Sequence, residues 1–206
     1  MSETVIIIDF ETTGLSPAQG ARATEVAAVR LVGNEIVDTF QSLMNSGSRV
    51  PPEIERITGI SNAMVRGAPP AAWVMQQLLQ FVGTAPLVAH NANFDSAFFA
   101  AECQHARLSA ATDFACTMKL AKRVYPLAPN YKLQTLLDYA DIDYSGRFHR
   151  ALADSVATSH LWLQMHSDLC AKYQVPSLKY RQLKTLSATS AAQVASKIES
   201  WKKKTN

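Results

Sequence analysis

Cysteine is scarce in this chain of 206 residues. The three cysteines, Cys103, Cys116 and Cys170, are widely spaced and form no C-x-x-C pair. An odd number of unpaired cysteines is not the pattern of a disulfide-stabilised secreted protein, and it fits a reduced cytosolic compartment best. We therefore predict a cytoplasmic protein whose cysteines belong to its core.

Long apolar runs are also missing. No stretch reaches the roughly 18 apolar residues that a membrane-spanning helix needs, and the N-terminus lacks the basic segment and cleavage site of a secretion signal. We therefore expect no membrane partner. Hydrophobic residues make up 48% of the chain and charged residues 18%, which is typical of a globular domain and not of a disordered segment.

Charge is unevenly distributed along the chain, although the net charge is only +3. From Lys172 to the C-terminus there are eight basic residues and one acidic residue, a net charge of +7, so residues 1–171 carry a net charge of −4. This division predicts a domain over residues 1–171 and a basic, partly helical tail over residues 172–206. The lysines of the tail could serve solubility alone, or they could contact the phosphates of a nucleic acid.

Within the tail, four apolar residues recur at near-helical spacing. They are Ala191, Val194, Ile198 and Trp201. This spacing predicts a short amphipathic helix that docks on the body by its apolar stripe and turns its lysines outward.

The segment VIIIDFETTGL, residues 5–15, places two carboxylates directly after an apolar run. Val5 and the three isoleucines that follow it predict a strand buried on both faces. Side chains two apart on a strand point to the same side, so Asp9 and Glu11 are neighbours on one face. Two ionised carboxylates in such a place repel each other and lose hydration, so they need a proton, a basic partner or a cation between them.

The remaining pattern predicts the fold class. Apolar stretches at residues 4–10, 24–32 and 36–44, separated by short turns, predict a meander of strands. Short strands are expected at 86–90 and 113–118, and helices are expected within 69–83, 93–106, 117–124, 132–140 and 150–171. Strands first, and then strands that alternate with helices, predict an α/β fold with a mixed sheet covered by helices.

Two further acids fall where this plan brings chain segments together. Asp95 is expected in the first turn of a helix that follows a strand, at the sheet edge where α/β proteins bind ligands. Asp154 follows His149 by five residues, roughly 140° around a helix, so His149 is expected in the loop before the helix. If the four acids converge, Mg²⁺ or Mn²⁺ is the natural counter-charge. Two such ions, with His149 as the general base, would suit attack of water on a phosphodiester.

Three segments of the chain together resemble the motifs of the DEDDh exonucleases. They are IIIDFETTGL with Asp9 and Glu11, VAHNANFD with Asp95, and HRALADS with His149 and Asp154. This DnaQ-like group has a ribonuclease-H-like fold and includes exonuclease X and the proofreading domains of polymerases. The resemblance implies that the four acids hold two Mg²⁺ or Mn²⁺ ions. It also implies that His149 activates water for the release of nucleoside 5′-monophosphates from 3′ ends.

The resemblance further implies contacts to the substrate. Thr12, Thr13 and Leu15 of the first motif would contact the terminal nucleotide. Leu15 would either wedge against the last base or simply cover the turn. Ile60 and Phe94 would line the nucleotide pocket, and the alternative for Phe94 is packing in the core.

The stretch CTMKLAKRVYP, residues 116–126, is similar to exonuclease X and to polymerase-fused proofreading domains, which favours DNA as the nucleic acid with a free 3′ end. Two alternatives stay open: an exoribonuclease that trims RNA ends, and a proofreading or repair subunit that acts bound to a polymerase or clamp. YRQLKTL in the tail is faintly similar to clamp-binding peptides but lacks their closing aromatic residue. His90 and Asn91 are expected to shape the turn of the second motif.

Overall fold

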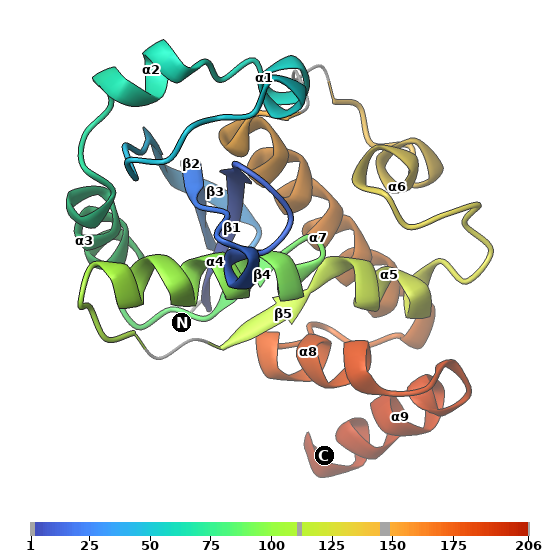
Figure 1. Ribbon diagram of the computed structural model, residues 1–206. Coiled ribbons are helices and arrows are strands. Elements are labelled where there is room, and N and C mark those ends of the chain that lie inside the picture. Colours follow the sequence, from blue (N-terminus) through green and yellow to red (C-terminus); the bar gives the residue numbers. More distant parts are fainter. Residues whose placement is uncertain (1–2, 111–112, 145–148, 206) are drawn as a thin grey trace.

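The computed structural model describes residues 3–110, 113–144 and 149–205. Its five strands form one mixed sheet in the order β3-β2-β1-β4-β5 (Figure 1). The strands are β1 (Thr4–Thr12), β2 (Ala23–Val32), β3 (Glu35–Leu43), β4 (Leu87–Ala89) and β5 (Phe114–Cys116). The β2 strand pairs antiparallel with β1 and β3, whereas β4 is parallel to both β1 and β5. The predicted α/β fold with a mixed sheet is confirmed.

Helices cover both faces of this sheet (Figure 1). They are α1 (Pro52–Thr58), α2 (Asn62–Gly67), α3 (Ala71–Val82), α4 (Ala92–His105), α5 (Thr117–Val124), α6 (Leu133–Tyr139), α7 (Ala151–Tyr173), α8 (Tyr180–Ala188) and α9 (Val194–Thr205). Short 3₁₀ turns occupy Pro17–Gln19 and Ala191–Gln193. None of the helices among the described residues is both long and apolar enough to cross a membrane.

The central strand β1 is buried on both sides because its side chains alternate between two hydrophobic clusters. Val5 and Ile7 pack with residues of α5, α7 and α8, whereas Ile6, Ile8 and Phe10 pack with residues of α3 and α4. Side chains two apart on a strand share a face. Asp9 and Glu11 therefore lie on the same face of the sheet as Val5 and Ile7, which is the face covered by α7.

Helix α7 comes close to the sheet because small residues line the contact. Ala27 of β2, which pairs with Asp9 of β1, is fully buried, as are Ala151 and Ala157 of α7. The hydroxyl of Ser155 donates to the carbonyl oxygen of Ala27 at 3.4 Å. A close approach of α7 at its N-terminal end brings that end onto the face of β1 that carries the acids.

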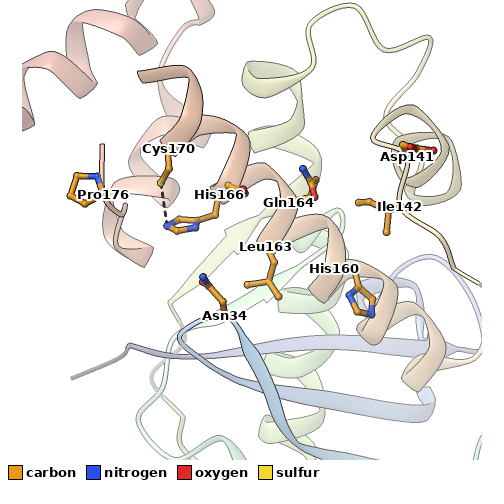
Figure 2. Close-up of a pocket in the computed structure, with 10 residues that line it drawn as sticks. Asn34, Asp141, Ile142, His160, Leu163, Gln164, His166, Cys170 and Pro176 are labelled. Carbon is orange, nitrogen blue, oxygen red and sulfur yellow. Dashed lines mark hydrogen bonds between the residues drawn. The ribbon is translucent and has the colours of Figure 1, made fainter. Parts of the chain in front are cut away.

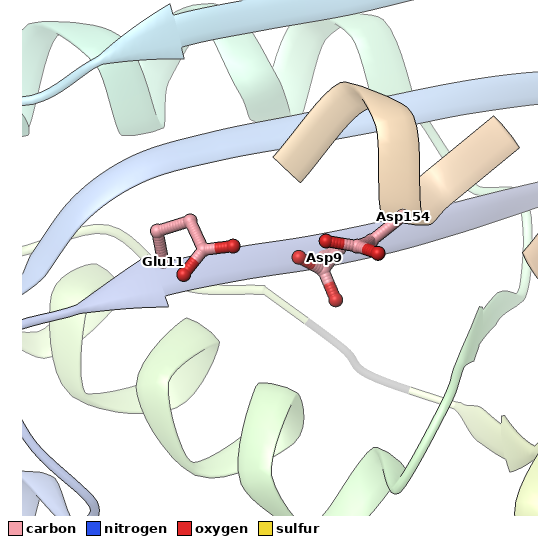
Figure 3. Close-up of side chains that lie close together, drawn as sticks. All are labelled: Asp9, Glu11 and Asp154. Atoms are coloured by element: carbon pink, nitrogen blue, oxygen red, sulfur yellow. The ribbon is translucent and has the colours of Figure 1, made fainter. Parts of the chain in front are cut away.

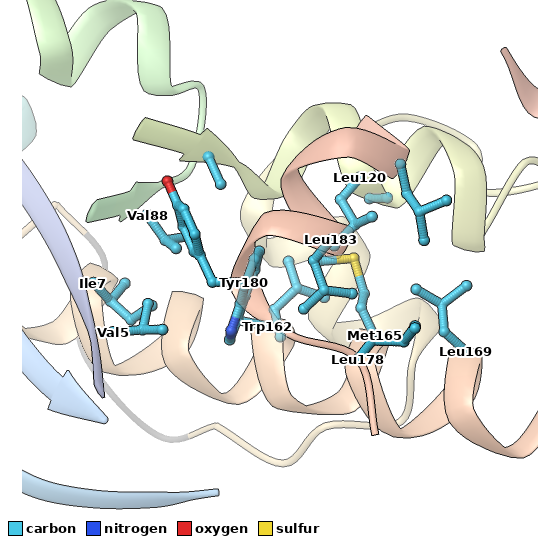
Figure 4. Packing of buried hydrophobic residues seen from close by; sticks show 14 of the residues in the cluster. Val5, Ile7, Val88, Leu120, Trp162, Met165, Leu169, Leu178, Tyr180 and Leu183 are labelled. Atoms are coloured by element: carbon cyan, nitrogen blue, oxygen red, sulfur yellow. The ribbon is translucent and has the colours of Figure 1, made fainter. Parts of the chain in front are cut away.

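The C-terminal segment packs into the main core (Figure 4). Leu183 and Leu186 of α8 and Val194 and Ile198 of α9 are buried in the same cluster as β1 and α7. The Tyr180 hydroxyl lies 2.7 Å from the carbonyl oxygen of Asp113 and 3.2 Å from that of Leu87. Asp113 precedes β5 and Leu87 begins β4, so Tyr180 holds the N-terminal ends of both strands.

Two consequences follow for the basic tail. Helix α7 extends to Tyr173, past residue 171, and residues 180–198 contribute to the same core as the sheet. The tail also lies at the N-terminal ends of β4 and β5, whereas Asp95 follows the C-terminal end of β4. The described lysines of the tail are thus attached at the end of the sheet away from the acids.

Candidate active site

Three of the four predicted acids meet between β1 and α7. Asp9, Glu11 and Asp154 each offer a carboxylate oxygen, and these oxygens all lie within 4.8 Å of one another. Figure 3 shows the three side chains converging from the strand and the first turn of the helix. Strand periodicity puts Asp9 and Glu11 on the α7 side, and the close approach of α7 supplies Asp154.

Asp95 borders this cluster from the other side of β1. It lies in the first turn of α4 and is 2% exposed, and its Oδ1 accepts a hydrogen bond from the backbone N–H of Phe10 at 3.2 Å. Asn91, immediately before α4, adopts the left-handed conformation with φ of 63°, which turns the chain from β4 into the helix. The charge of Asp95 acts on Asp9 strongly enough to raise the pKa of that carboxyl.

Burial raises the pKa of every acid in this site, and repulsion between the acids adds to the rise for Asp9 and Glu11. Burial is the largest cause for Asp9, followed by the neighbouring Asp95, Glu11 and Asp154, and the pKa of Asp9 lies well above its ordinary value. Burial, reinforced by Asp154, raises the pKa of Glu11 to about 8, and burial raises that of Asp95 to about 8. Burial also raises the pKa of Asp154, against the opposing hydrogen bond from His149.

This electrostatic state fits a hard divalent cation. At neutral pH the four carboxyl groups cannot all be ionised without a nearby positive charge, and carboxylate oxygens are the ligands that Mg²⁺ and Mn²⁺ prefer. The converging oxygens of Asp9, Glu11 and Asp154 could hold such an ion, with Asp95 beside them. This donor set agrees with the metal dependence that the resemblance of the sequence motifs to DEDDh exonucleases implies.

His149 is tied to the site through its backbone. Its N–H donates to Oδ2 of Asp154 at 2.8 Å, and its φ of 64° is left-handed. This bond joins the loop before α7 to an acid in the first turn of that helix. The exposed side chain of His149 lines the cavity around the acids. The structure therefore brings all five residues of the predicted catalytic set to one place.

The cavity around the acids measures about 650 Å³. Its lining consists of Asp9, Phe10, Glu11, Thr12, His90, Asn91, Phe94, Lys132, Leu133, Gln134, His149 and Asp154. Three of these residues, Lys132 to Gln134, come from the start of α6, which the sequence analysis did not associate with the site. The sequence offers no signal for them, because an exposed lysine before a helix is usually only a solvated residue.

His90 connects this additional wall to the rest of the site. Its Nε2 lies 3.0 Å from the carbonyl oxygen of Tyr131, and its Nδ1 lies 2.8 Å from the hydroxyl of Thr117. A carbonyl can only accept, so Nε2 carries the proton and Nδ1 accepts from Thr117. Burial lowers the pKa of His90 to about 4, which keeps the ring neutral. His90 thus fixes the chain just before Lys132 against β4 and α5.

Thr12 and Thr13 hold the loop that carries Leu15. The Thr12 hydroxyl donates to the carbonyl oxygen of Gly14 at 2.6 Å, and the Thr13 hydroxyl accepts from the backbone N–H of Arg22 at 2.9 Å. Thr13 and Leu15 line a second cavity of about 250 Å³. Leu15 is 85% exposed. Thr12 lines the cavity of the acids, so the two cavities adjoin at consecutive residues.

Arg22 and Glu102 anchor this loop to α4. The Arg22 guanidinium donates to both carboxylate oxygens of Glu102, at 2.9 and 2.8 Å, and the backbone N–H of Ala23 donates to the same carboxylate at 2.9 Å. Glu102 is 1% exposed. The loop that presents Leu15 is thereby fixed to the helix that carries Asp95.

Of the two residues predicted to line the nucleotide pocket, Phe94 lines the acidic cavity and Ile60 does not. Phe94 lines the cavity of the acids and also packs on Phe98, with ring centroids 4.8 Å apart. Ile60 has no exposed surface and packs with Val50 and Val65 in a small separate cluster. Ile60 is absent from the lining of the acidic cavity, because the turn between α1 and α2 folds its side chain inward.

Glu25 and Arg150 form a buried link that the sequence analysis missed. The Arg150 guanidinium donates to both oxygens of Glu25, at 3.0 and 2.7 Å, and the backbone N–H of Ala151 donates to Oε2 at 3.1 Å. Burial alone would raise the pKa of Glu25, but these bonds together with one from Gln41 lower it. Glu25 therefore fixes the N-terminus of α7, and with it His149 and Asp154, on β2.

A further cavity of about 510 Å³ lies along α7, away from the acids, and its other walls come from the turn at Asn34, from Asp141 and Ile142 after α6, and from Pro176 before α8 (Figure 2). Nε2 of His166 accepts a hydrogen bond from the backbone N–H of Leu178 at 3.1 Å, and Sγ of Cys170 lies 3.6 Å away. Burial lowers the pKa of His166. Since its Nε2 lone pair is engaged, we interpret His166 as a structural residue that ties the chain after α7 back to that helix.

The family model of the RNase_T exonucleases matches residues 6–161. Among curated relatives, the DNA polymerase III subunit epsilon of Aquifex aeolicus is 32% identical over 184 residues, which cover 89% of each chain. PolC-type DNA polymerases III, such as that of Bacillus subtilis with 34% identity, are also similar. The chain spans only 11 to 12% of the length of these PolC-type relatives.

Solved structures show the same similarity. Exonuclease X in complex with 5′ overhanging duplex DNA has a TM-score of 0.69 and 25% identity, over 89% of this chain and 99% of the other. The nuclease domain of 3′hExo, a DEDDh family member bound to rAMP, has a TM-score of 0.71 and 26% identity, over 81% of this chain and 93% of the other. The chain therefore shares its ribonuclease-H-like fold with nucleases of known structure, and its acidic cluster lies within that fold.

Proposed function

The chain belongs to the DEDDh group of the exonuclease family, and on that premise we propose that it removes nucleoside 5′-monophosphates from the 3′ ends of DNA. The observation that carries the proposal is the cluster of Asp9, Glu11 and Asp154, with His149 attached by its backbone to Asp154. The side chain of His149 lines the same cavity as these acids, and its volume of about 650 Å³ is large enough for a nucleotide, which supports the proposal.

The proposed cofactor is a pair of Mg²⁺ or Mn²⁺ ions held by Asp9, Glu11, Asp95 and Asp154. When bound, such ions offset the negative charge of the phosphate and favour ionisation of the attacking water. Asp9, Glu11, Asp95 and Asp154 would hold these charges beside the terminal phosphodiester. Asp95, held by the N–H of Phe10, keeps its carboxylate turned toward Asp9.

His149 would act as the general base. Its imidazole takes a proton from the water whose oxygen forms the new bond to phosphorus, and the bond from phosphorus to the 3′ oxygen of the preceding nucleotide breaks. The leaving 3′ oxygen takes up a proton from water, so the products are a nucleoside 5′-monophosphate and a strand shortened by one nucleotide with a free 3′ hydroxyl. The exposure of His149 allows the proton to pass on to solvent before the next cycle.

Substrate contacts would come from residues around the same cavity. Thr12 and Phe94 line it directly, so they would contact the terminal nucleotide. Thr13 and Leu15 line the adjoining cavity, and Leu15 projects far enough into solvent to meet a base. Ile60 would act only indirectly, by supporting the segment between α1 and α2.

DNA is favoured as the substrate because similar proteins include DNA polymerase III subunits and exonuclease X bound to duplex DNA. A proofreading role beside a polymerase is a second candidate, supported by the match to nearly the full length of the Aquifex epsilon subunit. A cytoplasmic location is part of this proposal, since such subunits act in replication. The segment YRQLKTL is a poor clamp ligand as folded, because Leu183 and Leu186 are buried.

Digestion of matched DNA and RNA strands of one sequence tests the substrate class. With Mg²⁺ or Mn²⁺ present, we expect mononucleotides to be released from the DNA strand faster than from the RNA strand. Faster release from RNA would reassign the enzyme as an exoribonuclease. Release that is unaffected by excess chelator would contradict the metal site itself.

A further inference from the structure

A basic cavity lies beside the loop that carries Leu15. It measures about 440 Å³ and is lined by Asn45, Gly47, Ser48, Arg49, Asn62, Val65 and Arg66. Ser48 and Arg49 also line the smaller cavity around Leu15. The cavity around Leu15 therefore shares a wall with the basic cavity and is linked to the acidic cavity through the consecutive residues Thr12 and Thr13.

Both arginines of this cavity are available to a ligand. Arg49 and Arg66 are exposed, and neither guanidinium has a hydrogen-bond or ion-pair partner within the part of the chain that the structure describes. Arg22 and Arg150, by contrast, are each engaged with two oxygens of a buried glutamate. The arginines at the basic cavity thus differ from those that serve the fold.

The rim that presents these arginines is held by polar side chains. The amide of Asn62 exchanges two hydrogen bonds of 2.8 Å with the backbone of Val50, beside Arg49. The amide of Asn45 donates to the carbonyl oxygen of Arg66 at 3.3 Å and accepts from the N–H of Gly47 at 3.0 Å. The backbone at both arginines is therefore fixed, while their charged ends remain free to bind.

Two unpaired guanidiniums in one polar hollow suit a phosphodiester. Guanidinium groups bind phosphate oxygens through paired, charge-assisted hydrogen bonds. The lining contains no carboxylate that would compete for the two arginines, although Glu53 and Glu55 lie nearby in α1. The guanidinium groups of Arg49 and Arg66 are therefore suited to bind phosphates of a nucleic acid.

The position of Leu15 indicates which strand the phosphate belongs to. The strand that is hydrolysed ends at the acids, where Lys132 supplies a cation on the wall contributed by the start of α6. Leu15 stands 85% exposed between that cavity and the arginines. A terminal base pair that meets Leu15 would have its hydrolysed strand on the Lys132 side and its complement on the Arg49 side.

We propose that the cavity of Arg49 and Arg66 binds a backbone phosphate of the strand that is not hydrolysed, so that the substrate is the end of a duplex. This inference rests on the proposed 3′-to-5′ exonuclease function. In this proposal Leu15 and the two arginines act together. Leu15 separates the terminal base pair, and the arginines bind the complementary strand after it is displaced.

The test compares wild type, the double variant Arg49→Gln with Arg66→Gln, and the control Lys172→Ala. Lys172 is an exposed cation near the C-terminal end of α7, roughly 27 Å along the helix from Asp154. Hydrolysis of one 3′-labelled strand is measured alone and as part of a blunt duplex. We expect the double variant to slow the duplex reaction on the order of tenfold and to flatten its salt dependence by about one to two units of slope. Single-strand hydrolysis should stay as in wild type, and Lys172→Ala should change neither reaction.

A duplex whose complement carries uncharged methylphosphonates near the end identifies the strand directly. This duplex should be a poorer substrate for wild type, by about the same factor as the double variant loses, and the two changes combined should cost no more than either alone. Equal slowing of single-strand and duplex hydrolysis by the double variant would overturn the proposal. A wild type that degrades single strands but not duplex ends would overturn it as well, whereas no hydrolysis of either would contradict the proposed function instead.

Discussion

Replacing Glu11 by glutamine should stabilise the metal-free protein while it removes activity. Burial, together with Asp154 and the other acids, raises the pKa of Glu11 from 4.5 to about 8. Between these values the unfolded chain releases a proton that the folded chain keeps, so the free energy of unfolding falls as the pH rises through this window. Below pH 4.5 the penalty is absent, and above pH 8 it is complete.

The magnitude follows from the same shift. At pH 7 the difference from 4.5 corresponds to about 3 kcal/mol at ~1.36 kcal/mol for each pKa unit. Solvent screening at this half-buried side chain reduces the gain from Glu11→Gln to on the order of 1–3 kcal/mol. For a chain of this size that gain raises Tm by roughly 3–10 °C.

Thermal unfolding in excess chelator, followed at pH 5, 7 and 8, measures the effect. The advantage of Glu11→Gln should be small at pH 5 and grow toward pH 8, and added Mg²⁺ or Mn²⁺ should stabilise wild type more than the variant. Glu53→Gln, at an exposed position in α1, removes the same charge and should leave Tm unchanged. A Glu11→Gln protein no more stable than wild type at pH 8 would refute the picture of a repulsive, cation-seeking cluster.

Three further outcomes are expected. His149→Ala should lower turnover by ~10²–10⁴-fold with nearly unchanged DNA affinity, and a loss of affinity at normal turnover would make His149 a binding residue instead. Leu15→Ala should slow hydrolysis of duplex ends more than that of single strands, whereas equal slowing would leave Leu15 as a residue that covers the turn. Leu186→Ala, in the buried face of α8, should cost roughly 2–5 kcal/mol of stability, while Leu127→Ala at an 84% exposed position should cost almost nothing. Equal stability of these two leucine variants in chemical denaturation would show that α8 is not part of the core.

Local patterns predicted the acids well because each acid depends on a short-range rule. Alternation along β1 places Asp9 and Glu11 on one face, and the first turns of α4 and α7 follow their strand or loop in sequence. The strand β1 and the helices α4 and α7 come together because helices normally cover the faces of such a sheet. The convergence of Asp9, Glu11 and Asp154 therefore required no long-range information beyond the fold class.

The supporting contacts could not be predicted in the same way. Glu25 and Arg150 are 125 residues apart, and Arg22 and Glu102 are 80 residues apart. A single acid in the strand ATEVAAV could equally have been a surface residue, and nothing local pairs it with an arginine after a distant loop. Ile60 shows the converse limit, because an apolar residue beside a turn can face a pocket or a core, and the packing of Val50 and Val65 decides.

The tail illustrates both cases. The spacing of Ala191, Val194, Ile198 and Trp201 predicts an apolar stripe. The last three pack against the core, whereas Ala191 is exposed, because it lies in the 3₁₀ turn before α9. The site of docking depends on Tyr180, whose hydroxyl reaches carbonyl groups at the start of two strands. Since residues 180–198 complete the core, a test of the tail's charge should replace lysines and leave the helices intact.

The most direct test of the central claim is digestion of single-stranded DNA labelled at its 3′ end or at its 5′ end, with Mg²⁺, by wild type and Asp9→Ala. We predict immediate release of labelled mononucleotide from the 3′ end, stepwise shortening of the 5′-labelled strand, and loss of both with chelator or with a folded Asp9→Ala protein. Undiminished activity of that variant, or release of mononucleotides from the 5′ end, would contradict the claim.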